Sequence, residues 1–419
     1  MNNAYVVIKI LFLLAILTIP YDSLPFFYYS IYSPSNIVFI VPAFILLIFT
    51  RLKVSKPGKY ILVFTFVSFF HSLVSGLINN DLHTSIKHIV TLVVMISSFF
   101  VAEYSFSIKE NYKVYTRTFM WAFALSLLTG SLQLLNQFGL NISFIRWFTS
   151  LFVTRLYEVR MQMLSGEPSW AVLHLLVLIP FLVWSNYASK LKNFIIIIAV
   201  LLFFLSFSSY GYAVVLLSLI MYILINFNMK SIFKYILLTI SLLALIEGID
   251  VLIQLMGINS YYSHRFDISF YFNNNVLEED GSMFVRVVFP YIGILEFLEF
   301  PLGCGGGFYY VNAGKYLVEF FDYGLKYYEV LNYYINNTMQ PICLYAKLLA
   351  EEGILSLFLF YSFYLVLKRC INKREKYIWC LAIALNFNFA SYACVDFWIL
   401  LGALSGGFFR EENIGEENI

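Results

Sequence analysis

Two arginines and a glutamate precede a long apolar run in the middle of the chain. Arg155 and Arg160 are followed by Glu167 and Pro168, where the apolar run begins. A guanidinium binds phosphate through paired N–H donors, and a nearby carboxylate can accept a proton from a hydroxyl group. This set of groups could transfer a substituent away from a phosphate-bearing leaving group. The simpler interpretation is that Glu167 and Pro168 only start a helix, since both are favourable in a first turn.

Other polar residues extend this candidate site. Arg286 lies among phenylalanines and valines, where a guanidinium needs an anionic partner. His174 follows Glu167 by seven residues, so we expect it on the same helix face, pointing toward the same cavity. His264 and Arg265 stand in a polar stretch further along. We interpret His264 as an exposed loop residue and hold it in reserve as a second candidate base.

The composition indicates a membrane protein. The chain has 419 residues, of which 61% are hydrophobic and 12% charged, whereas soluble domains are about 25% charged. The net charge of +2 argues against a nucleic-acid partner. The five cysteines are scattered without metal-ligand spacing, so we predict neither a metal site nor a cofactor.

Apolar runs predict an all-α polytopic integral membrane protein with about twelve transmembrane helices. The runs lie at 4–20, 36–50, 60–78, 87–105, 116–137, 168–184, 193–207, 210–227, 234–253, 340–367, 377–392 and 394–409. The uncharged stretch 194–227 would measure about 51 Å as one helix, longer than the hydrocarbon core. We therefore predict two short helices with a break at Ser206–Gly211.

Lysine and arginine lie in alternate short loops, which predicts that both termini are cytoplasmic. Residues 1–410 then form one multi-pass domain, and the acidic segment 411–419 is a cytoplasmic tail. Two long loops, 138–167 and 254–339, face outward. The second is large, connects spans nine and ten, and is rich in tyrosine and acidic residues. Such groups suit sugar binding, and an aromatic belt at the membrane interface is an equal alternative.

The outward loops also contain predicted helices. Phe144, Trp147, Phe148, Leu151 and Phe152 recur at helical spacing, which predicts an amphipathic interfacial helix. Arg155 continues the same stripe. In the second loop, we predict that Ser282 caps a helix over 283–300.

Ionisable residues inside predicted spans need partners, because burying a charge in a membrane is costly. Lys347 and Glu351 are four residues apart and can neutralise each other. His71 has no partner evident in the sequence, and we interpret it as a hydrogen-bonded core histidine.

The ordered set of these short motifs resembles the bacterial O-antigen polymerases (Wzy), in the superfamily shared with O-antigen ligases. The resemblance covers about residues 140–370. It rests on Gly166-Glu167-Pro168-Ser169 opening a span, Ser206–Gly211 between two short spans, Arg286 leading to Pro301–Gly305, and Asn337 before Glu352-Gly353-Ile354. Arg155 and Gly166 also match the Arg-x10-Gly pattern described for some of these polymerases. The pattern is absent after Arg286 and Arg265.

The resemblance implies polymerisation of undecaprenyl-diphosphate-linked repeat units on the periplasmic face of the bacterial inner membrane. The growing glycan would move from its lipid diphosphate to the non-reducing end of the next repeat unit. Glu167, Arg286 and Arg160 would be catalytic, and Arg155, Arg265, His264, His174 and Asn337 would bind substrate. Partners would be the lipid-linked donor and acceptor, membrane lipids, a chain-length regulator and a flippase of the same pathway.

Three alternatives remain open. An O-antigen ligase typically has a histidine just before the asparagine at the start of span ten, where this chain has Tyr334-Ile335-Asn336-Asn337. A lipid-linked oligosaccharide flippase should have many cations within its spans and short loops. A small-solute permease offers no reason for a large outward loop.

Overall fold

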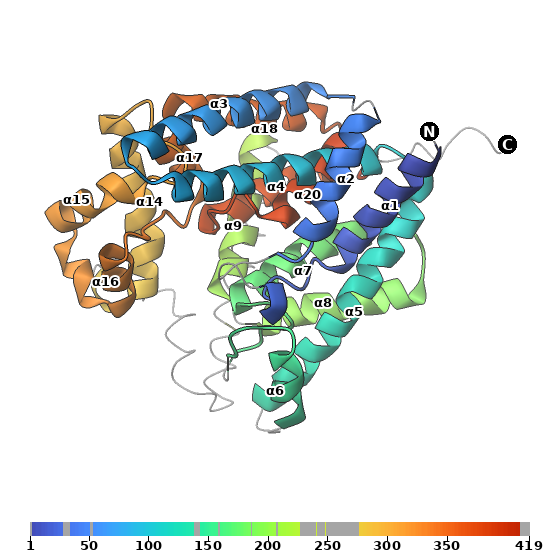
Figure 1. Cartoon of the computed structure of the whole chain (residues 1–419). Coiled ribbons are helices and arrows are strands. Elements are labelled where there is room, and N and C mark those ends of the chain that lie inside the picture. The colour runs from blue at the N-terminus through green and yellow to red at the C-terminus, as the bar shows by residue number, and fades with distance from the viewer. Residues whose placement is uncertain are drawn as a thin grey trace.

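The computed structural model describes residues 2–27, 34–50, 53–137, 143–157, 160–185, 187–206, 208–226, 240, 248 and 276–410. Within these ranges the ordered elements are helices, and no strand is present (Figure 1). The predicted all-α class is therefore correct for the part of the chain that the structure describes.

Each predicted span coincides with a helical segment, except 234–253, of which the structure describes residues 240 and 248 alone. These helices are α1 (Asn2–Leu17), α2 (Ile37–Phe49), α3 (Lys56–Ile78), α4 (Leu82–Phe106), α5 (Tyr112–Gln137), α7 (Pro168–Val183), α8 (Lys190–Leu205), α9 (Ser209–Ile225), α17 (Leu344–Glu352) with α18 (Leu357–Arg369), α19 (Lys373–Leu385) and α20 (Val395–Gly406).

The lengths of these helices support a membrane protein without fixing twelve crossings. Five helical segments in the described ranges are long and apolar enough to span a membrane, and α8 with α9 would make a sixth. Helices α1, α2, α7 and α20 are apolar but shorter.

The break predicted in the uncharged stretch is confirmed. Helix α8 ends at Leu205, α9 begins at Ser209, and their axes differ by 109°. Gly211 lets the first turn of α9 approach α7, because a Cβ atom there would lie 2.4 Å from Cγ1 of Val172.

Helix α20 lies at the centre of the bundle. It packs along α4 and also contacts α7, α18 and α19, while α3 lies beside both α4 and α18 (Figure 1). Its side chains from Val395 to Ser405 are almost all buried, as expected of a helix that is apolar all round.

The loops that the charge pattern assigned to one side contact each other in the structure. Arg369 pairs with Glu103 at 3.3 Å, and the Arg374 guanidinium donates to the Phe409 carbonyl at 2.7 Å. Arg117 lies over the Tyr187 ring, 5.1 Å from its centroid. These basic segments therefore share one end of the bundle, as the prediction requires.

Residues 276–339 form a separate group of helices, seen at the left of Figure 1. They are α13 (Val276–Glu279), α14 (Gly281–Glu299), α15 (Tyr310–Phe320) and α16 (Tyr328–Ile335). Phe289, Tyr309 and Leu317 help to form their shared apolar core. Helix α14 is capped by Asp280, whose side chain accepts from the backbone N–H groups of residues 282 and 283, so the prediction of Ser282 as the cap was wrong. Helix α14 is also long and apolar enough to span a membrane, although the sequence analysis placed it in the outward loop.

The amphipathic helix is shorter than its pattern predicted. Helix α6 (Ser143–Ser150) ends before Leu151, so Arg155 is not on its apolar stripe. The side chains of Phe144 and Trp147 are 59% and 58% exposed, and Ile145 and Thr149 pack inward. The aromatic face therefore points away from the protein, as an interfacial helix requires.

Candidate functional site

Glu167 occupies the N-cap position of α7, with extended backbone and Pro168 as the first helical residue. Its carboxylate makes no capping hydrogen bond to the backbone and instead accepts from the Ser169 hydroxyl at 3.3 Å. The local sequence thus starts the helix as predicted, but the Glu167 carboxylate is not used to cap it.

The segment before Glu167 is held by Asp22. The Asp22 carboxylate accepts from the Gly166 backbone N–H at 2.7 Å and from the Ser165 hydroxyl at 2.5 Å. Gly166 has no room for a side chain, because a Cβ atom would lie 2.8 Å from Cβ of Ser23. Contacts from the region after α1 therefore fix the backbone that presents Glu167.

His174 is a buried structural residue. The prediction that it points into a cavity was wrong. Its side chain is 1% exposed, and its ring lies between Asp22, 2.9 Å from Nε2, and Asp396, 3.1 Å from Nδ1. A doubly protonated imidazolium donates to both carboxylates and compensates part of their charge. His174 therefore holds Asp22, which in turn binds the backbone segment before Glu167.

Asp22 and Asp396 are functional neighbours of His174 that the sequence did not single out. Both are almost fully buried, Asp22 beyond the end of α1 and Asp396 in the first turn of α20. A carboxylate within an apolar run requires a partner, and His174 is a buried group of opposite charge when protonated. The need for a partner could have pointed to Asp22 and Asp396 in the sequence. Nothing local in the sequence shows that their partner is His174.

Gln162 organises the loop that contains the two arginines. Its side-chain amide donates to the backbone carbonyls of Arg155 and Ser165, each at 3.0 Å, and accepts from the Tyr157 backbone N–H at 2.6 Å. Arg160 is half-buried and lines a cavity of about 60 Å³ with Tyr157 and Gln162. The loop is thus a compact structure tied to the start of α7.

Charges from two distant segments act on the Glu167 carboxylate. Burial raises the pKa of Glu167, and the Ser169 hydroxyl and the guanidinium groups of Arg155 and Arg286 oppose this rise. Arg155 stacks on Tyr157, 4.8 Å from the ring centroid, and Arg286 donates to the Ser282 hydroxyl on α14. The structure therefore brings Arg155 and Arg286 close enough to Glu167 to act on its charge.

Aromatic and acidic residues that sequence reasoning did not single out surround this group. Burial raises the pKa of Tyr333 to about 12, with further contributions from Glu329 and Glu167. The Tyr333 hydroxyl donates to Glu329 at 3.1 Å. The pKa of Tyr157 is also raised, chiefly by burial and then by Glu167, while Arg155 and Arg160 lower it. Helix α16 thus adds a tyrosine and a second carboxylate to the site.

Of the remaining predicted site residues, the structure describes Asn337. Asn337 follows the end of α16 with a φ of +51°, and its side chain is exposed. Asparagine tolerates this left-handed backbone conformation. In the structure, Asn337 therefore serves to end helix α16. His264 and Arg265 lie outside the described residues.

A second polar cluster is buried between α3, α4 and α17. Glu352 accepts from Ser68 and lies 3.1 Å from His71 Nδ1 and 3.3 Å from His88 Nε2. His71 is therefore hydrogen-bonded, as predicted, and Glu352 is the partner that the sequence did not reveal. Lys347 and Glu351 form the predicted pair at 3.8 Å.

No protein-family model matches the chain, and no curated protein matches it significantly.

Proposed function

We propose that this protein polymerises lipid-diphosphate-linked glycan repeat units at the outer face of a bacterial inner membrane. The acceptor sugar hydroxyl attacks the anomeric carbon of the donor glycan, and the bond from that carbon to the lipid diphosphate breaks. The hydroxyl proton passes to Glu167, and the bonding electrons leave with the diphosphate. A single displacement of this kind inverts the anomeric configuration.

One observation supports the proposal most directly. Arg155 precedes α7 and Arg286 lies on α14, yet both guanidinium groups act on the half-buried Glu167 carboxylate. A carboxylate whose pKa is raised by burial is a better proton acceptor near neutral pH. Guanidinium groups within electrostatic range of it can stabilise the charge that develops on a departing diphosphate.

The surroundings fit the two other parts of such a substrate. The exposed aromatic face of α6 suits a lipid interface, next to the loop that contains Arg155 and Arg160. Tyr157, Tyr333 and Glu329 offer rings and an acceptor oxygen to a sugar. In this proposal Arg286 and Arg160 bind the diphosphate, and Arg155 assists them.

The test compares surface polysaccharide in cells that express the variants Glu167→Gln and Arg286→Ala. We expect lipopolysaccharide cores that bear a single repeat unit, with polymer yield about 10²–10⁴-fold lower in Glu167→Gln, the usual range for a lost general base. The control variants Glu319→Gln and Lys315→Ala remove exposed charges from α15 and should leave the polymer unchanged.

Other banding patterns would contradict the proposal. Bare core with polymer retained on the lipid carrier indicates a ligase, and bare core with repeat units trapped inside the cell indicates a flippase. Unchanged polymer at normal protein levels would overturn the roles of Glu167 and Arg286.

A further inference from the structure

A second cavity lies at the far end of α7 from Glu167. Trp184 and Ser185, which line it, follow that helix directly, and the 16 residues of α7 measure about 24 Å. The cavity has a volume of about 500 Å³, within the range of small-molecule sites. Its walls come from the start of α5, the α7–α8 connection and the residues after α20.

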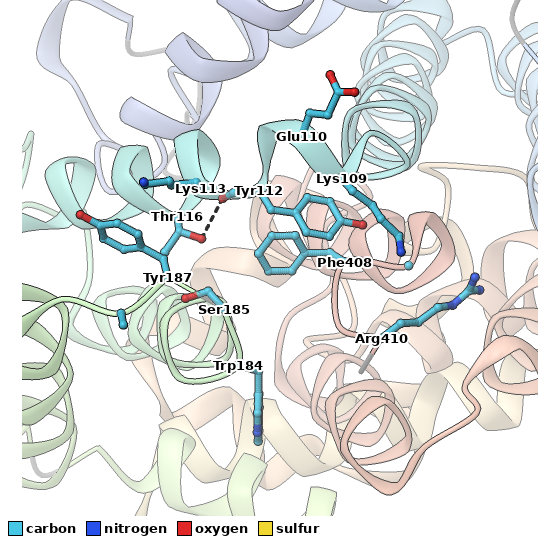
Figure 2. A pocket seen from close by; sticks show the side chains of 12 residues that line it. Lys109, Glu110, Tyr112, Lys113, Thr116, Trp184, Ser185, Tyr187, Phe408 and Arg410 are labelled. Atoms are coloured by element: carbon cyan, nitrogen blue, oxygen red, sulfur yellow. Dashed lines mark hydrogen bonds between the residues drawn. The ribbon is translucent and has the colours of Figure 1, made fainter. Parts of the chain in front are cut away.

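Cations dominate the charged groups of this cavity. Lys109, Lys113 and Arg410 line it, with Glu110 as the one carboxylate among the lining residues that the structure describes. Figure 2 shows Lys109 and Arg410 on one side of the Tyr112 and Phe408 rings and Lys113 on the other. Arg410 also pairs with Glu375 at 3.7 Å.

Aromatic rings form much of the remaining wall. Tyr112 and Phe408 pack edge to face at 4.7 Å, and Trp184 and Tyr187 stand on the α7–α8 side (Figure 2). Tyr187 is also the ring over which Lys113 and Arg117 lie, at 5.9 and 5.1 Å. Tyrosine and tryptophan next to lysine are typical of the membrane–water interface.

Exposed apolar side chains continue from the cavity along the helices. On α5, Lys113, Arg117 and Trp121 follow at intervals of four, so they share one face, and Trp121 is 66% exposed. Val114 beside Lys113 and Val183 beside Trp184 are exposed as well. A soluble anion makes no use of such a surface, whereas the acyl chains of a lipid bury it.

We propose that this cavity binds the phosphate headgroup of an anionic phospholipid, with its acyl chains along the exposed apolar surface of α5 and α7. Lys109 and Arg410 lie on the side of the Tyr112 and Phe408 rings where the phosphate binds, and Lys113 adds positive charge to the cavity from the other side. Basic cavities between helices, on the side that contains the basic loops, favour such headgroups. The site is separate from Glu167 and does not depend on the proposed polymerisation.

The test measures phospholipid retained by the full-length protein in detergent, by native mass spectrometry. The protein is purified from the double variant Lys109→Gln/Lys113→Gln and from a matched control, Lys59→Gln/Lys373→Gln. All four lysines are exposed, and the control pair lies outside the cavity. Each protein is titrated with phosphatidylglycerol, with zwitterionic phosphatidylcholine and with inorganic phosphate, and its thermal stability is recorded.

We expect the wild type and the control to bind phosphatidylglycerol with an affinity at least about tenfold higher than their affinity for phosphatidylcholine. The variant should lose that preference together with the thermal stabilisation by phosphatidylglycerol, while it keeps its stability without lipid. Equal retention by variant and control overturns the site. Full displacement of the lipid by inorganic phosphate would show a soluble-anion site and overturn the lipid assignment.

Discussion

Two opposing influences act on the Glu167 side chain. Burial favours its neutral form, while Ser169, Arg155 and Arg286 favour the carboxylate. A base for a sugar hydroxyl must be ionised before it reacts and must still hold a proton afterwards. In the proposed reaction, the arginines that stabilise the leaving diphosphate would therefore also influence the pH at which Glu167 can accept a proton.

This coupling predicts how pH affects activity when one arginine is removed. In Arg155→Gln the pKa of Glu167 should rise further, because one of the charges that lower it is gone. The base must be deprotonated, so activity should fall at a higher pH on acidification than in the wild type. The measurement is polymer formation against pH with purified lipid-linked repeat units.

Lys315→Gln is the control, since Lys315 is exposed and pairs with Glu299 on the surface of the α14–α15 group. An acid limb that stays in place or moves to lower pH in Arg155→Gln would mean that Glu167 is not the titrating base.

At the scale of elements, His174 joins three parts of the chain. Its ring connects α7 with Asp22, beyond the end of α1, and with Asp396 on the central helix α20. The site segment 165–167 therefore takes its position from the packing of the bundle, even though the Glu167 side chain lies in a loop-like region.

Removal of this ring should destabilise the protein strongly. His174→Ala leaves two buried carboxylates without their shared partner, which costs about 3–5 kcal/mol when one member of a buried ion pair is deleted. The measurement is unfolding of the purified protein in detergent. His83→Ala removes an exposed histidine from α4 and should change stability by less than about 0.5 kcal/mol. Similar losses in the two variants would show that the Asp22–His174–Asp396 contacts do not stabilise the fold.

The same element scale explains what the sequence could and could not predict. The run of apolar residues located the helices, and the length of stretch 194–227 required the break before α9. The end of α6 was missed because Leu151 and Phe152 fit the helical period by chance while lying in the following turn. Asp22 and Asp396 were missed because their contact with His174 depends on tertiary packing, which no local period records.

At the scale of the whole molecule, the structure separates two chemically different ends. Lys113, Arg369 and Arg374 lie at the end that includes the cavity proposed to bind phospholipid, and Glu167 lies at the opposite end of α7. The concentration of lysine and arginine in alternate loops predicted that these loops share one end of the bundle. The contacts between the basic segments agree with this prediction. The side of the membrane that each end faces stays a prediction.

Cysteine labelling can determine that orientation. Ser150→Cys at the end of α6 and Ser107→Cys between α4 and α5 both place a thiol at an exposed position. A membrane-impermeant maleimide should label Ser150→Cys in intact spheroplasts but label Ser107→Cys only after lysis. Four of the five native cysteines are buried and Cys304 is partly covered, so the unmodified protein provides the background. Labelling of both variants in intact cells, or of Ser107→Cys alone, would contradict the proposed topology.

The bridge between His174 and Asp396 also sets an order of events during synthesis. The two residues are 222 positions apart, so α7 leaves the ribosome long before Asp396, the second partner of His174, has been synthesised. At typical rates of 5–20 residues per second this interval is on the order of tens of seconds. During that time the histidine has Asp22 as a partner, but the site segment lacks its final support. The segment before Glu167 thus gains its full support only when α20 enters the bundle, and a chain that stops before Asp396 lacks one of the two carboxylates that hold His174.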